Sequence, residues 1–148
     1  IAVCRMIAAD NPSKALKAAW RLNVGRFADD REEPRTLEYL ARLWTDEDAG
    51  AALEWVGKLP GDDESRRDHL VKGIVASIAA RDPALASRII VENSPLDSSV
   101  QVDAAMEVLQ KWSARDYAAA LRWLSGLASP VARERGMDQL ASLPEAGR

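Results

Sequence analysis

The chain has very few of the residues from which many catalytic and metal sites are built. It contains one cysteine, Cys4, and one histidine, His69, among 148 residues. A lone cysteine forms no internal disulfide, and we interpret Cys4 as a small buried apolar residue rather than a reactive thiol. A single histidine without cysteine or acidic ligands at metal spacing is interpreted as structural. We therefore expect no catalytic residue, no metal and no cofactor.

Long apolar runs and basic patches are also missing. No apolar run approaches the roughly 18 residues of a membrane span, so we expect no membrane insertion. The net charge is −3, and lysine and arginine are scattered singly or in pairs such as Arg66-Arg67. Without a basic face the chain is not expected to bind nucleic acid or an anionic membrane. It begins at Ile1 without a signal-peptide pattern, which fits a mature or trimmed piece of a longer protein and leaves the localisation open.

Motifs for phosphate binding and hydrolysis are not present either. The glycines are isolated, so there is no phosphate-binding loop, and no Gly-x-Ser-x-Gly elbow occurs. Three acidic runs stand at Asp29–Glu33, Asp46–Asp48 and Asp62–Glu64. Paired carboxylates can perform acid–base chemistry, but each run precedes a predicted helix, where acidic groups cap free N–H groups. We favour capping, and none of the runs has the form of a calcium loop.

A 34-residue period is the strongest pattern that the sequence contains. Asp48, Asp82 and Asp116 stand at equal intervals (82 − 48 = 34; 116 − 82 = 34). Other residues keep the same step: Leu37, Val71 and Ala105; Leu40, Ile74 and Val108; Trp44, Ile78 and Trp112; Ala52, Ala86 and Ala120; Trp55, Ile89 and Trp123; Val56, Ile90 and Leu124. A fixed period in this range is typical of stacked two-helix units. It predicts an all-α fold of antiparallel helix hairpins stacked as an α-solenoid.

The helix starts are marked by capping residues followed by proline. Asn11-Pro12, Asp82-Pro83 and Ser129-Pro130 each place a side-chain acceptor before a proline that fits the first helical position, and Asp97 is a candidate cap for a further helix. The apolar spacing predicts nine helices, at about 1–9, 12–23, 34–45, 48–59, 63–80, 83–93, 97–113, 116–127 and 130–143. They form one domain over residues 1–148, with units at about 1–30, 34–61, 63–95 and 97–128 and a terminal helix at 130–143.

The last helix and the tryptophans carry further expectations. Helix 130–143 leaves the 34-residue phase, and we assign its apolar set to Val131, Met137, Leu140, Ala141 and Leu143. It is interpreted as a terminal cap or as half of a truncated unit.

The tryptophans lie beside alanine, leucine and valine, so we expect core packing rather than exposed binding anchors for Trp20, Trp44, Trp55, Trp112 and Trp123.

The sequence resembles tetratricopeptide repeats over residues of about 34 to 128. The segment Asp116-Tyr117-Ala118-Ala119-Ala120-Leu121, followed by Trp123-Leu124 and Leu127, is similar to the second helix of such a repeat, and Asp48–Pro60 and Asp82–Pro95 are weaker copies. The pattern also resembles degenerate Asp-Pro…Ala…Trp…Leu-Pro repeats of uncharacterised bacterial proteins. The Trp, Leu-Gly and Tyr residues usual in the first helix of each repeat are absent. The resemblance implies a right-handed solenoid that binds proteins and performs no catalysis.

The leading functional hypothesis is a non-catalytic scaffold that binds a protein or peptide partner. A curved stack presents a concave face built from first helices, and the candidate partner-binding residues there are Asp68, Lys72, Gln101 and Glu107. One alternative is a structural spacer module of a larger bacterial protein, with no partner of its own. A third, less favoured reading is a helical enzyme that uses carboxylates. Neither the partner nor the oligomeric state can be read from the sequence.

Overall fold

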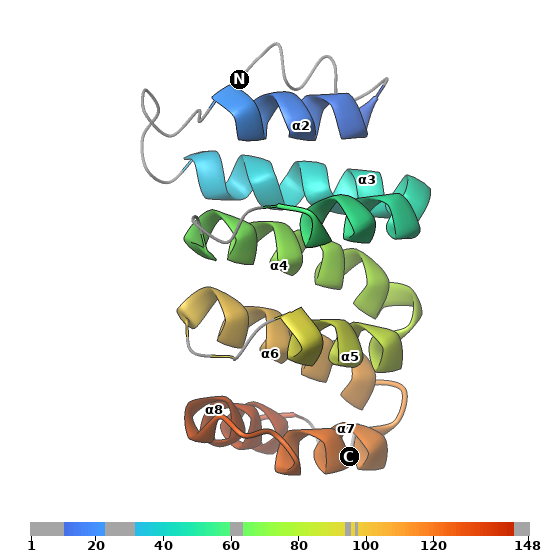
Figure 1. Cartoon of the computed structure of the whole chain (residues 1–148). Coiled ribbons are helices and arrows are strands. Elements are labelled where there is room, and N and C mark those ends of the chain that lie inside the picture. Colours follow the sequence, from blue (N-terminus) through green and yellow to red (C-terminus); the bar gives the residue numbers. More distant parts are fainter. Residues whose placement is uncertain (1–10, 23–31, 60–63, 94–95, 97, 144–148) are drawn as a thin grey trace. The chain divides into compact units, whose positions relative to one another are not determined.

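Figure 1 shows a computed structural model that describes residues 11–22, 32–59, 64–93, 96 and 98–143. Within these ranges the regular structure consists of seven helices and contains no strand. The helices are α2 (Pro12–Leu22), α3 (Glu32–Gly57), α4 (Glu64–Arg81), α5 (Pro83–Asn93), α6 (Ser99–Ser113), α7 (Tyr117–Ser125) and α8 (Pro130–Ala141). The predicted all-α class is therefore confirmed for the described residues.

The predicted number of nine helices is not confirmed. The helix predicted at 1–9 lies outside the described residues, and the helices predicted at 34–45 and 48–59 form the single element α3. Asp48 interrupts α3 with a non-helical backbone (φ −151°, ψ 88°), so the predicted boundary is present as a kink inside this helix. The chain divides into two compact units, Ile1–Ser77 and Ile78–Arg148, and the division falls inside α4.

The three equally spaced aspartates have the same local structure. Asp48, Asp82 and Asp116 each accept a hydrogen bond at Oδ1 from the backbone N–H three residues ahead, with an N···O distance of 3.0 Å in every case. Asp116 has backbone angles (φ −149°, ψ 89°) close to those of Asp48. The side chain satisfies an N–H group that has no partner inside the helix, so each aspartate starts a helix.

Most of the other predicted starts are also occupied by capping side chains. Asn11 Oδ1 accepts from the N–H of Lys14 at 3.1 Å, and Ser129 Oγ accepts from the N–H of Ala132 at 3.2 Å, with Pro130 in the first turn. The start of α6 differs from the prediction, because its N-cap is Ser98 and not Asp97. Ser98 and Gln101 form a reciprocal capping box, which moves the start of this helix past Asp97.

In the first unit, α2 packs on α3, and α4 approaches α3 through a glycine. The buried side chains Leu16, Leu37 and Leu40 belong to this core. A Cβ atom at Gly73 of α4 would collide with the carbonyl oxygen of Glu38 and lie 2.9 Å from the Cβ of Ala41. The two helix backbones are therefore closer than any other residue at position 73 allows.

In the second unit, α6 is the central helix and packs against α5, α7 and α8. Its buried side chains lie on several sides of the helix, as expected for an element with neighbours all round; they are Gln101, Val102, Ala104, Ala105, Met106, Val108, Leu109 and Ser113. Helix α8 buries only a narrow stripe, Ala132, Gly136 and Leu140. A Cβ atom at Gly136 would lie 2.9 Å from Leu124 Cδ2 and 3.2 Å from Leu109 Cδ2. Because Gly136 has no side chain, α8 can lie close to α6 and α7.

Replacing Gly73 by alanine should destabilise the first unit. The added methyl group meets the backbone of Glu38, which cannot move without shifting α3. Overpacking of this kind costs roughly 1–3 kcal/mol, more than the ~1 kcal/mol that alanine gains over glycine in a helix. Urea unfolding followed by tryptophan fluorescence should show a lower unfolding free energy for Gly73→Ala.

The matched control is Gly57→Ala, in the last turn of α3. A Cβ atom at Gly57 meets nothing within 4 Å. This variant should be as stable as the wild type or more stable, by up to ~1 kcal/mol. Equal stability of the two variants would contradict the close approach of α3 and α4.

Candidate functional site

The candidate residues predicted in the first unit, Asp68 and Lys72, both lie on α4 and are half-buried. Lys72 Nζ lies 3.5 Å from Glu38 Oε1, and the same oxygen lies 2.6 Å from His69 Nδ1. Asp68 also already has an interaction partner. His69 is therefore part of a polar contact between α3 and α4.

The candidate residues predicted in the second unit, Gln101 and Glu107, lie on α6. Gln101 is only 9% exposed, and its Oε1 accepts the N–H of Ser98 in the capping box. Its side chain thus closes the start of α6, and we exclude it from the proposed binding surface. Glu107 is half-buried.

The four predicted residues do not occupy equivalent positions of the repeat. Asp68 and Lys72 correspond to Val102 and Met106 (68 + 34 = 102; 72 + 34 = 106), which are buried. Gln101 and Glu107 correspond to other positions, Arg67 and Gly73 (101 − 34 = 67; 107 − 34 = 73). A surface that repeats from unit to unit is therefore not formed by this set.

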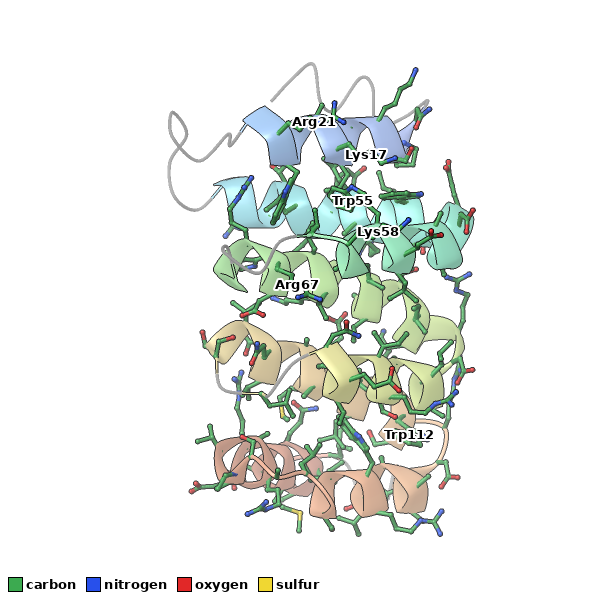
Figure 2. The ribbon with its side chains drawn as sticks, in the orientation of Figure 1. Lys17, Arg21, Trp55, Lys58, Arg67 and Trp112 are labelled. Carbon is green, nitrogen blue, oxygen red and sulfur yellow. The ribbon has the colours of Figure 1, made fainter. Side chains whose placement is uncertain are left out.

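Three tryptophans of the first unit form an aromatic cluster. The ring centroids of Trp20 and Trp55 lie 6.1 Å apart with an interplanar angle of 82°, and those of Trp44 and Trp55 lie 5.6 Å apart. Figure 2 shows Trp55 in the space between α2 and α3. Trp44 is buried, whereas Trp20 and Trp55 are half-buried. The cluster joins α2 to both halves of α3 and packs the unit; the predicted core position is confirmed for Trp44, whereas Trp20 and Trp55 are only partly covered.

Two cations cover the edges of this cluster. The guanidinium carbon of Arg66 lies 4.3 Å from the centroid of the Trp20 ring, and Nζ of Lys17 lies 5.2 Å from that of Trp44. Arg66 also donates a hydrogen bond to the Trp20 carbonyl oxygen at 3.2 Å. Each cation–π contact at a partly exposed site contributes ~0.5–1 kcal/mol. One face of Trp20 and one face of Trp44 are thereby covered within the unit.

Two adjoining cavities lie in the second unit, each of about 480 Å³. They share Leu96, Ala128 and Ser129, and together we call them the α7–α8 groove. The first cavity is lined by Leu96, Ser98, Ser99, Val102, Ala128, Ser129, Pro130, Val131 and Arg135, and the second by Val91, Leu96, Arg122, Trp123, Gly126, Leu127, Ala128 and Ser129. The groove thus follows the ends of α5 and α7 and the beginnings of α6 and α8.

The groove combines exposed apolar side chains with positive charge. Val91 is 52% exposed and Val131 is 64% exposed, and both line it. Among the described residues that line it, the ionisable ones are Arg122 and Arg135. Arg135 is paired with Asp103 at 2.6 Å, whereas Arg122 is exposed and has no ion pair within the part of the chain that the structure describes.

Leu96, at the junction of the two cavities, has a left-handed backbone (φ 60°), and it is the only non-glycine residue with positive φ among the described residues. A leucine in this conformation costs roughly 1–2 kcal/mol, and such residues persist only where surrounding contacts hold them. The Leu96 side chain is buried, and its carbonyl oxygen accepts a hydrogen bond from Ser129 Oγ at 3.2 Å. The start of α8 therefore holds the backbone at the centre of the groove.

The pattern of α8 in the sequence predicted a different face of this helix. Of the expected apolar set, Leu140 is buried, but Val131, Met137 and Ala141 are exposed and Leu143 is half-buried. The buried stripe uses small residues, Ala132 and Gly136, because α8 packs closely against Leu124 and Leu109. Because this stripe faces the core, Val131 is left exposed at the groove.

In the described ranges no three histidine, cysteine, aspartate or glutamate side chains gather where they could hold a metal ion. None of the described helices combines the length and the apolar character that crossing a membrane requires.

Ser129→Ala should destabilise the second unit. It removes both the cap of α8 and the hydrogen bond to the Leu96 carbonyl, and loss of such a cap costs roughly 1–2 kcal/mol. Ser125→Ala is the control, since Ser125 is exposed and its hydroxyl donates only to the Leu121 carbonyl of its own helix. Urea unfolding followed by circular dichroism should separate the two variants, and similar curves would contradict the structural role given to Ser129.

Comparisons of the chain with family models, with curated proteins and with solved structures found no match. The resemblance to tetratricopeptide repeats therefore stays a prediction from the residues.

Proposed function

We propose that this protein is a non-catalytic scaffold of helical repeats that binds a protein or peptide partner. The observation that carries the proposal is the recurrence of one capping geometry at Asp48, Asp82 and Asp116. Three helices start in the same way at equal intervals, which is the behaviour of repeated structural units. Proteins of this architecture generally act by presenting an extended surface to a partner.

The burial of equivalent residues supports the repeat. Four residues after each aspartate stands an alanine with at most 1% exposure, namely Ala52, Ala86 and Ala120. Four residues further along, Val56, Ile90 and Leu124 are exposed by no more than 2%. The same register therefore faces the core each time, with a small residue where helices meet and a larger one a turn later.

We further propose that the units stack as a right-handed, tetratricopeptide-like α-solenoid. Short junctions make successive helices antiparallel neighbours, and each pair covers part of the apolar surface of the next. Small-angle X-ray scattering tests this arrangement. A compact chain of this length has a radius of gyration of about 15 Å, and a solenoid should give a clearly larger value with an elongated distance distribution. A compact, symmetric distribution would contradict the stack.

The exposed groove in the second unit favours a binding role over a spacer role. A spacer needs only a well-solvated surface, whereas here Val91 and Val131 stand half or more exposed around two cavities. Apolar side chains gathered in this way typically mark a contact surface.

Cross-linking and rebinding test the proposed function. The intact chain is immobilised and cross-linked in a lysate of its source organism, and recovered proteins are identified by mass spectrometry and then purified. We expect at least one purified protein to rebind the chain saturably with a fixed stoichiometry. The spacer interpretation replaces the proposal if every recovered protein fails to rebind in purified form.

A further inference from the structure

We infer that the α7–α8 groove binds a peptide segment that carries both aliphatic and acidic side chains. This inference rests on the proposed function and adds the location of the site and the chemistry of its partner. Two properties of the groove carry it: exposed apolar side chains at both cavities, and the exposed Arg122, which has no ion pair among the described residues.

The apolar side chains define what the peptide offers. Val91 and Trp123 line one cavity and Val131 the other, while Leu96 is shared by both. Val91 and Val131 are largely in contact with water, and covering them releases that water. Aliphatic side chains of a partner can cover them, because each cavity of about 480 Å³ is large enough for several side chains.

The charge of the groove selects an acidic partner. Arg122 is exposed and without an ion pair in the described part of the chain, and it stands beside Trp123. At the other cavity, the starts of α6 and α8 both line the wall through Ser99 and Pro130. Helix starts carry partial positive charge from unpaired N–H groups, which favours carboxylates. The whole chain has a net charge of −3, so this positive edge is a local feature.

An extended segment fits better than the other occupants. Val91 and Val131 at the groove stand half or more exposed, whereas a site for a small molecule usually buries most of the molecule's surface. The two cavities adjoin through Leu96, Ala128 and Ser129, so one chain can reach both. A second copy of this acidic protein is the competing occupant, and its binding is distinguishable by measurement of the oligomeric state.

Selection from a random peptide library tests the inference. The intact protein is presented to a phage library of random dodecapeptides, and enriched clones are synthesised and their affinities measured by fluorescence anisotropy. We expect enriched peptides to combine aspartate or glutamate with leucine, isoleucine or valine. We also expect binding to weaken as salt is raised from low concentration, because the exposed charges are screened. Enrichment of basic or uniformly polar peptides would overturn the inference.

Two pairs of matched variants locate the binding site. Arg122→Glu reverses the charge at the groove, while Arg88→Glu reverses that of an exposed arginine 34 residues earlier which lines neither cavity (122 − 34 = 88). Val131→Ser and Met137→Ser change two exposed apolar residues of α8, of which only Val131 lines the groove. All four positions are exposed, so the fold should persist, and circular dichroism checks this.

We expect Arg122→Glu to lower the affinity for the selected peptides about tenfold or more, which corresponds to ~1.4 kcal/mol. Val131→Ser should lower the affinity about fivefold. Both control variants should change it by less than about twofold. Peptides that bind all variants equally would place their site elsewhere; the groove assignment then fails while the proposed function stands. If no clone is enriched, the inference fails and the rebinding of purified partners alone decides the proposed function. Self-association that Arg122→Glu abolishes would replace the peptide by a second copy.

Discussion

An aspartate with an extended backbone at the junction between two helices is the constraint on which the helix pairs depend. At Asp48 and Asp116 the backbone leaves the helical region for one residue, and the side chain at once satisfies an N–H of the next helix. Asp82 stands alone between α4 and α5 and makes the same hydrogen bond. Each cap contributes only ~1 kcal/mol, but it determines the residue at which the new helix begins. The register of every following side chain depends on that choice.

Close approach of helices follows from the same register. Once the start is determined, the fourth residue after each aspartate faces the core, and alanine at that place leaves room for a neighbouring helix. Gly73 and Gly136 extend this principle to α4 and α8, where a methyl group would meet a backbone or a buried leucine. Tryptophan then fills the wider spaces, as Trp112 and Trp123 do with ring centroids 6.0 Å apart, and Figure 2 shows Trp112 between α6 and α7.

The helical class and most helix starts could be predicted, because capping is local chemistry that short stretches of sequence record. Ser98 and Gln101 show that a local signal was also missed, since serine followed three residues later by glutamine is the pattern of a capping box. The face of α8 was not predictable from hydrophobicity, because its buried stripe contains Gly136 and Ala132 while Val131 is left outside. The groove was not predictable either, since it joins residues as distant as Val91 and Val131 and depends on the backbone of Leu96.

Helix pairing adds to the positive charge that Arg122 gives the groove. In the second unit α6 and α8 each begin after an N-cap serine, Ser98 or Ser129, and the starts of both helices line the same cavity. Their partial positive charges therefore add instead of cancelling. Helix starts thus supply positive potential in addition to the arginines, in a chain whose net charge is −3. The acidic segment that we propose as the partner would therefore meet a positive edge, although the chain as a whole carries a net charge of −3.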